Sequence, residues 1–241
     1  MHMMLGGPYT NLVLAVPHAV GTPARFDWRR IASVAADARR RTDWLTDELF
    51  ATSEPGVRMV RGRVSRLACD LERLEGEKDR LCDFKNATSL WPADIVAQFS
   101  NRMLSEWYGY RAEVLAAAAE GLRPLIVDCH SFPEDYAPDV DVCIGFNDDA
   151  SCPPKDVLDG LASIFKAGGF TVAFNHPFAN ALAPLDYCGH AVMIEVNKTC
   201  YLAPWDGGPK MGARSEPLRT CLQTAYRWLL GRTKRVCSTK C

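Results

Sequence analysis

The chain contains no hydrophobic run close to the roughly 20 residues that a membrane-spanning helix needs. Its apolar stretch near the amino terminus, residues 11–17, is too short for that purpose, and no basic segment of the kind that opens a secretory signal precedes it. We therefore expect a cytoplasmic protein that has no membrane partner.

The sequence also lacks an excess of charge of either sign. Its 28 Lys and Arg residues nearly balance its 29 Asp and Glu residues, which gives a net charge of −1. A nucleic-acid partner is therefore not expected, and any attraction for an acidic substrate must be local. The length of 241 residues predicts one domain over 1–241, with a loose lead-in at 1–10 and a frayed tail at 233–241. The oligomeric state stays open.

Several short motifs are absent. None of the ten cysteines forms a CxxC pair, which argues against a zinc finger or a thioredoxin-like site. HExxH and HxH are also missing, so any metal site must be discontinuous in sequence. Ser131 has no GxSxG setting of the kind that exposes a nucleophilic serine.

Short apolar runs alternate with amphipathic segments, which predicts an α/β fold with a mixed, largely parallel sheet flanked by helices. We expect the run at 140–146 to pair with the run at 124–129, an extended segment at 66–71 and a charged surface loop at 72–86. The predicted strands are 11–17, 57–60, 124–129, 140–146, 170–175 and 191–196, and the predicted helices are 27–40, 92–120, 156–167 and 216–230.

Polar residues of a metal-binding type follow three of these runs. His18 and His130 each come at the end of an apolar run, and Glu195 ends a third. The carboxyl ends of parallel strands form the crevice in which α/β proteins bind ligands. Two imidazoles and a carboxylate, from Asp43 or Asp47, would suit a catalytic zinc, and another divalent metal would fit nearly as well.

Each of these residues also has a plainer interpretation. A single histidine at a strand end is usually a hydrogen-bonding loop residue, and Glu195 would be an edge carboxylate paired with Lys198 or an arginine. Asp43 and Asp47 lie four residues apart, so one helical turn would place both on one face; Glu48 is a weaker third choice. His176 and His190 are interpreted as rim or substrate-contacting groups.

Five segments, in order and spanning most of the chain, resemble the N-formylglutamate amidohydrolase family. They are VPHAVGTP at 16–23, RTDWLTDELF at 41–50, VSRLACDLER at 64–73, IVDCHSFP at 126–133 and MIEVNKTCYL at 193–202. The resemblance implies a sandwich fold similar to that of zinc carboxypeptidases. It also implies metal-dependent hydrolysis of a carbon–nitrogen bond other than a peptide bond.

Carried over to this chain, the resemblance implies His18, Asp43 and His130 as the metal ligands and Glu195 as the general base. Asp43 is favoured over Asp47 because it stands in the TDW motif.

The substrate would be a small N-acyl amino acid, whose carboxylate suits Arg66 and Arg73, with Asp70 orienting one of them. Asn197, together with Lys198, would contact the same group. Glu72 departs from the family's usual DLNR pattern and adds negative charge near the presumed carboxylate pocket. This puts N-formylglutamate itself in doubt. Trp44 and Tyr201 would wall the pocket or belong to the core.

Two other functions remain open. One is a carboxypeptidase-like hydrolysis of short peptides or cell-wall fragments, which would use the same metal chemistry. The other is a non-catalytic metal-binding or ligand-binding relative that keeps the fold.

Overall fold

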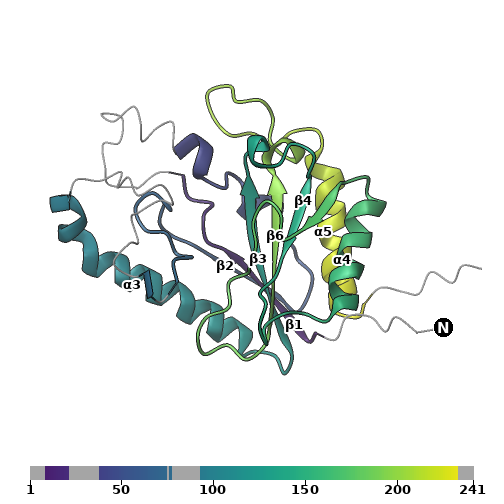
Figure 1. Ribbon diagram of the computed structural model, residues 1–241, viewed down its shortest axis with the longest axis horizontal. Coiled ribbons are helices and arrows are strands. Elements are labelled where there is room, and N and C mark those ends of the chain that lie inside the picture. Colours follow the sequence, from purple (N-terminus) through teal and green to yellow (C-terminus); the bar gives the residue numbers. More distant parts are fainter. Residues whose placement is uncertain (1–8, 22–37, 75, 78–92, 233–241) are drawn as a thin grey trace, which may run out of the picture.

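The computed structural model describes residues 9–21, 38–74, 76–77 and 93–232. A six-stranded sheet runs through the molecule in the order β2-β1-β3-β6-β4-β5, with helices on both faces (Figure 1). All neighbouring strands are parallel except β4 and β6. The predicted α/β architecture is therefore confirmed. The strands are β1 (Asn11–Val16), β2 (Val57–Arg61), β3 (Pro124–Phe132), β4 (Val142–Gly145), β5 (Val172–Phe174) and β6 (His190–Asn197).

The predicted pairing of 140–146 with 124–129 is wrong, because β6 lies between β3 and β4. β6 pairs with β3 over eight positions, from Leu125 with His190 to Phe132 with Asn197. β4 has only four residues and pairs antiparallel with β6. Hydrophobic runs identify buried strands but carry no information on which of them are neighbours.

Helix α3 (Ala93–Ala118) covers one face of the sheet, and α4 (Lys155–Ala167) and α5 (Ser215–Leu229) cover the other (Figure 1). These bounds confirm the three predicted helices within two residues. Side chains alternate across β3: Ile126 packs in the cluster on the α3 side, whereas Val127 lies in the larger cluster on the α4 and α5 side. Even-numbered residues of β3 therefore face α3.

Of the remaining predicted segments, some lie outside the described residues and one is wrong. Most of the predicted helix at 27–40 lies outside the described residues, as do residues 1–8 and 233–241, although 38–41 are helical. The extended segment predicted at 66–71 is wrong: residues 66–68 form a turn. The amides of Ala68 and Cys69 donate to the carbonyl of Ser65, whose hydroxyl accepts from the amide of Leu67 at 3.3 Å. A serine side chain that bonds nearby backbone favours such turns over strands.

Two short helical turns complete the part that positions the site, α2 (Thr46–Leu49) and η4 (Lys198–Cys200); a third, η3 (Glu134–Tyr136), follows β3. Within the described ranges, no helix has both the length and the apolar composition that crossing a membrane requires.

Candidate metal and catalytic site

His18 lies two residues beyond the end of β1 and is completely buried. The chain leaves β1 close against the segment that follows β2, where the amide of Gly62 donates to the carbonyl of Val16 at 2.8 Å. A Cβ atom on Gly62 would lie only 2.1 Å from the carbonyl oxygen of Pro17. Glycine is therefore required at 62, and this close approach fixes the backbone that carries His18.

His130 lies inside β3, because the strand continues three residues beyond the predicted end at 129. Its side chain is 3% exposed and faces the α3 side together with Asp128, two residues earlier. Cys129 points to the opposite face and packs in the larger core cluster.

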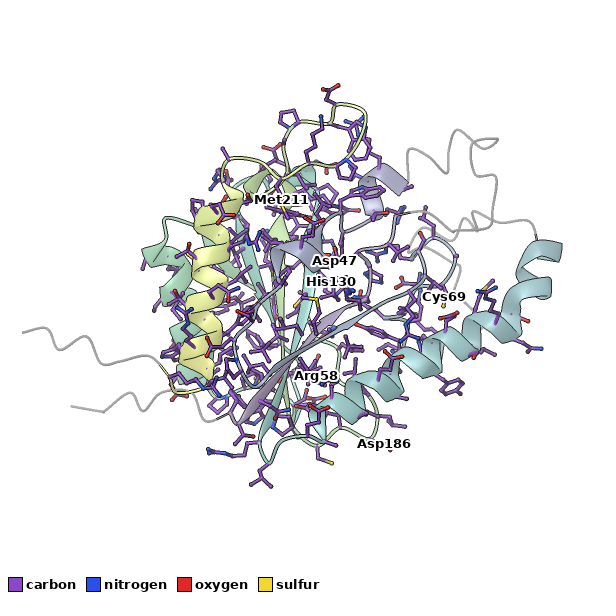
Figure 2. All side chains as sticks on the ribbon, turned by 180° about the vertical axis from the view of Figure 1, so that it is seen from behind. Asp47, Arg58, Cys69, His130, Asp186 and Met211 are labelled. Carbon is purple, nitrogen blue, oxygen red and sulfur yellow. The ribbon has the colours of Figure 1, made fainter. Side chains whose placement is uncertain are left out.

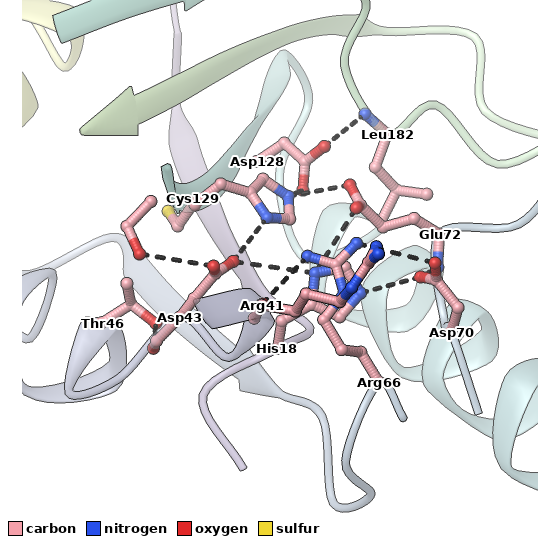
Figure 3. Close-up of polar contacts among 12 residues, drawn as sticks. His18, Arg41, Asp43, Thr46, Arg66, Asp70, Glu72, Asp128, Cys129 and Leu182 are labelled. Atoms are coloured by element: carbon pink, nitrogen blue, oxygen red, sulfur yellow. Dashed lines mark hydrogen bonds and ion pairs between the residues drawn. The ribbon is translucent and has the colours of Figure 1, made fainter. Parts of the chain in front are cut away.

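The structure brings His18, Glu72 and His130 together as a group whose ligand atoms all lie within 4.8 Å of one another. Glu72 Oε1 lies 2.8 Å from His130 Nε2, and Glu72 Oε2 lies 3.4 Å from His18 Nδ1. Figure 3 shows the Glu72 carboxylate directed at this cluster. Glu72 was predicted to open a charged surface loop at 72–86; its side chain is 30% exposed, and its carboxylate faces the imidazoles. Residues 75 and 78–86 of that loop lie outside the described residues. His18, Glu72 and His130 could bind a metal ion.

Asp43 lies in the same cluster and is 1% exposed. Its Oδ2 is 3.0 Å from His130 Nδ1 and 3.7 Å from His18 Nδ1, and its amide donates to the carbonyl of His18 at 3.1 Å. Asp47, the alternative from the sequence, instead pairs with Arg61 at 3.1 Å. Asp43 stays a predicted ligand, and its position beside both imidazoles supports the choice of Asp43 over Asp47.

Two further carboxylates bond to the imidazoles. Asp70 Oδ1 lies 2.9 Å from His18 Nε2, and Asp128 Oδ1 lies 2.9 Å from His130 Nε2. The second oxygen of Asp128 accepts the amide of Leu182 at 2.8 Å (Figure 3). Sequence reasoning assigned Asp70 to the arginines and missed Asp128. The alternation of side chains along β3 would have placed Asp128 on the same face as His130.

The electrostatics of the cluster favour charged imidazoles. Burial and Arg66 lower the pKa of His18, but Glu72 and Asp70 more than compensate, so its pKa is raised. Burial likewise lowers the pKa of His130, and Glu72 and Asp128 hold it well above its usual value. Burial raises the pKa of Glu72, but the two imidazoles bring it down to about 2. The neighbouring carboxylates therefore favour the protonated form of both imidazoles when no metal is bound.

A divalent metal fits these residues. Among the described residues, His18 Nδ1 is buried without a hydrogen-bond partner, and it faces the carboxylates of Glu72 and Asp43. A metal-ligating histidine usually bonds a carboxylate through its other ring nitrogen, as His18 does with Asp70. Two imidazoles and a carboxylate are the donors that catalytic zinc sites use.

Glu195 lies opposite His130 in the register of β6 against β3, so the two side chains share a face of the sheet. Because β6 is an interior strand, Glu195 is not an edge carboxylate. It is 7% exposed, and its Oε2 is buried with no hydrogen-bond partner in the part of the chain that the structure describes. Burial raises its pKa to about 8. A carboxyl group of this kind can exchange protons near neutral pH.

The two candidate substrate-binding arginines share Asp70. Arg66 Nη2 lies 3.6 Å from Asp70 Oδ2, and Arg73 Nε lies 3.7 Å from the same oxygen. Arg66 Nη1 also donates to the carbonyl of Arg41 at 3.3 Å. Both guanidinium groups therefore lie beside Asp70, which bonds His18, and the negative charges of Asp43 and Glu195 also raise the pKa of Arg66. Their contact with substrate stays a prediction.

The side-chain amide of Asn197 forms hydrogen bonds with other residues of the chain. Its Nδ2 donates to the carbonyl of Val140 at 3.1 Å, and its Oδ1 accepts from the amide and hydroxyl of Thr199 at 3.1 and 2.8 Å. The side chain thus caps η4. A direct contact of Asn197 with substrate stays a prediction.

The remaining candidates from the sequence are two aromatic residues and two histidines, and they differ in burial and in partners. Tyr201 is fully buried, with its hydroxyl 2.9 Å from Ser131 Oγ, whereas the partly buried ring of Trp44 packs against Trp205. His176 is exposed. His190 begins β6, five residues before Glu195, and lies 2.8 Å from the hydroxyl of Tyr9.

Fold and site together define an α/β protein with a candidate metal centre beside a buried carboxyl group. A sequence profile of the N-formylglutamate amidohydrolase family matches residues 10–202, and the chain belongs to this family of hydrolases. The family assignment implies a small-molecule substrate. No curated protein matches the chain.

Two solved structures are similar in fold. An N-formylglutamate amidohydrolase from Ralstonia eutropha JMP134 superposes with a TM-score of 0.67 at 18% identity, covering 92% of each chain. A gene product from Agrobacterium tumefaciens superposes with a TM-score of 0.59 at 18% identity, covering 91% of this chain and 89% of the other.

Proposed function

We propose that this chain is a zinc-dependent hydrolase that cleaves the amide bond of an N-acyl amino acid, such as the N-formylglutamate for which its family is named. The observation that carries the proposal is the position of Glu195. Its buried carboxyl oxygen, which has no hydrogen-bond partner within the described ranges, shares a sheet face with His130, a member of the candidate metal group. A site that only bound a metal would not need this carboxyl group.

His18 and His130 would hold the metal, together with a carboxylate from Glu72 or Asp43. Zinc in such a site supplies a Lewis acid that polarises the carbonyl and lowers the pKa of bound water towards about 7. Asp70 and Asp128 hold the two imidazoles in orientation through the nitrogens that they bond.

Glu195 acts as the general base and then as the general acid. Its Oε2 accepts a proton from the water that attacks the amide carbon. When the carbon–nitrogen bond breaks, the same carboxyl group returns that proton to the nitrogen of the leaving amine. The products are a carboxylic acid, formate in the case of a formyl group, and the free amino acid. The first step needs the ionised form of Glu195. The positive charge of a zinc ion held by the histidines would favour this form, because a nearby cation lowers the pKa of a carboxyl group.

Arg66 and Arg73 would bind a carboxylate of the substrate. The negative charge of Glu72, which distinguishes the DLER segment, is directed at the imidazoles at 2.8 and 3.4 Å. The Glu72 carboxylate therefore belongs to the candidate metal group. Because its charge faces the imidazoles, it argues less strongly against a dicarboxylic substrate.

The test combines metal analysis with a substrate panel. Metal content is measured by plasma mass spectrometry, and amine release is assayed on N-formyl amino acids and on short peptides. About one zinc per chain, with turnover of the formyl compounds that is lost on chelation, supports the proposal. Turnover of peptides alone would favour the carboxypeptidase-like alternative. A chain that binds no metal after reconstitution would overturn both.

A further inference from the structure

Lys198 places a buried positive charge in the site. Its side chain is 12% exposed, and its Nζ donates to the carbonyl of Arg40 at 2.6 Å. In the described part of the chain, this carbonyl is its only hydrogen-bond acceptor, although an ammonium group carries three donors. The nearest carboxylate oxygen, Asp43 Oδ1, lies 3.9 Å away, beyond hydrogen-bonding distance. Two donors of a nearly buried cation are thus left for another acceptor.

Asp43 does not neutralise Lys198 alone. Its Oδ1 already accepts the hydroxyl of Ser131 at 3.3 Å, and its Oδ2 lies 3.0 Å from His130 Nδ1. Because Asp43 already bonds the imidazole of His130, its negative charge neutralises the Lys198 ammonium group only in part. A buried cation with unfilled donors is costly unless an anion binds to it.

The backbone at Lys198 is fixed relative to Glu195. Lys198 begins the turn η4, which follows directly on β6, and Asn197 caps this turn through Thr199. The amide of Leu202 also donates to the carbonyl of Lys198 at 2.8 Å. The backbone of Lys198 is therefore held three residues after the proposed base, and the negative charge of Glu195 acts to raise the pKa of the Lys198 ammonium group against the effect of burial.

Lys198 and the two arginines lie nearest to different carboxylates, although Lys198 and Arg66 bond the neighbouring carbonyls of Arg40 and Arg41. Arg66 and Arg73 share Asp70, which bonds His18, whereas Lys198 approaches Asp43, which bonds His130. The sequence assigned all three cations to one substrate group, and the structure shows that Lys198 has a different nearest carboxylate from the two arginines.

We propose that Lys198 binds the α-carboxylate of the substrate, the carboxylate joined to the carbon that bears the scissile amide nitrogen. This inference rests on the proposed function. The α-carboxylate lies only two bonds from that nitrogen, so its binding group must adjoin the base, as Lys198 does through η4. Arg66 and Arg73 are then left for a second polar group of the substrate.

The test compares zinc-loaded wild type with Lys198→Met, which keeps the chain length, and Lys198→Arg, which keeps the charge. Lys155→Met, on the exposed start of α4, is the matched control. The probes are N-formylglutamate and N-formylisoglutamine, in which an amide replaces the α-carboxylate. Turnover gives kcat and KM, and calorimetry measures binding of N-formylglutamate independently of turnover.

We expect Lys198→Met to raise KM for N-formylglutamate at least about tenfold, the loss typical of one charge-assisted hydrogen bond, with little change in kcat. KM for N-formylisoglutamine should not change, and Lys198→Arg should restore most of the affinity. A loss confined to kcat would overturn the assignment, because Lys198 would then act only in the transition state. Equal losses on both probes would also overturn it.

If the wild type binds N-formylglutamate without hydrolysing it, the proposed function fails, and the binding data still decide the role of Lys198. Weaker binding by Lys198→Met alone supports the assignment, and equal binding by the wild type and this variant contradicts it. No binding by the wild type overturns both proposals.

Discussion

Glu72 bridges the two imidazoles of the site, with one carboxylate oxygen 2.8 Å from His130 Nε2 and the other 3.4 Å from His18 Nδ1. The bridge joins a turn after β2 to the end of β1 and to the interior of β3. A charged residue in a charge-rich segment thus becomes the third member of the candidate metal group.

Replacing Glu72 with Gln should weaken zinc binding. The change removes one negative charge and one of the oxygens that face both imidazoles, and we expect a loss of affinity on the order of 10- to 100-fold. Competition with a chromophoric chelator measures the affinity. Glu113→Gln, in a surface pair with Arg63, serves as the control and should bind zinc as the wild type does. Unchanged affinity in Glu72→Gln would remove Glu72 from the group.

Zinc binding should release protons. Neighbouring carboxylates raise the pKa of His18 and His130, so the metal-free protein holds protons that must leave before the imidazoles can bind zinc. Apparent zinc affinity should therefore increase as pH rises from about 6 to about 8. Calorimetry in buffers of different ionisation enthalpy counts the protons. A heat that is independent of the buffer would contradict protonated histidines in the metal-free site.

The metal-free protein should lose stability as pH rises because of Glu195. Burial raises the pKa of this group from the ordinary 4.5 to about 8, so between these values the folded state holds a proton that the unfolded state has released. The free energy of unfolding then falls with rising pH, by at most about 1.4 kcal/mol per pH unit for one proton.

Glu195→Gln should abolish this contribution. Urea denaturation of the two metal-free proteins at pH 5, 6.5 and 8 would measure it. We expect the variant to gain stability relative to the wild type as pH rises. A constant difference across the three pH values would exclude a raised pKa for Glu195.

Gly62→Ala should destabilise the fold, because its Cβ would lie 2.1 Å from the carbonyl oxygen of Pro17. The backbone beside His18 must then shift, and we expect a cost of about 1–3 kcal/mol together with weaker zinc binding. Gly208→Ala is the matched control, since a Cβ there has no described atom within 4 Å. The measurement is the free energy of unfolding. Equal stability of the two variants would contradict the prediction, because it would show that the backbone after β1 can shift without cost.

The parts of the site that lie on strands could be predicted from the sequence. His18, His130 and Glu195 each follow a hydrophobic run, and buried parallel strands place such residues at one edge of the sheet. Asp128 was missed although its two-residue spacing from His130 puts both on one face. The alternation of side chains along a strand was therefore enough to predict that Asp128 lies beside His130.

The contribution of Glu72 could not be predicted in this way. It follows a turn that Ser65 stabilises, in a segment whose charge pattern is typical of a solvated loop. Its position depends on tertiary contacts with His18 and His130, which are distant in sequence. The order of the strands also could not be predicted, because on its hydrophobic pattern alone β4 could pair with either β3 or β6.

The most direct test of the central claim is a joint measurement of zinc content and N-formylglutamate hydrolysis in the wild type and in Glu195→Gln. Because Glu195 is proposed to move protons without holding the metal, the variant should keep about one zinc per chain and lose about 10²- to 10⁴-fold in kcat. A variant that keeps both its zinc and its full kcat would contradict the account, since Glu195 would then have no part in the hydrolysis.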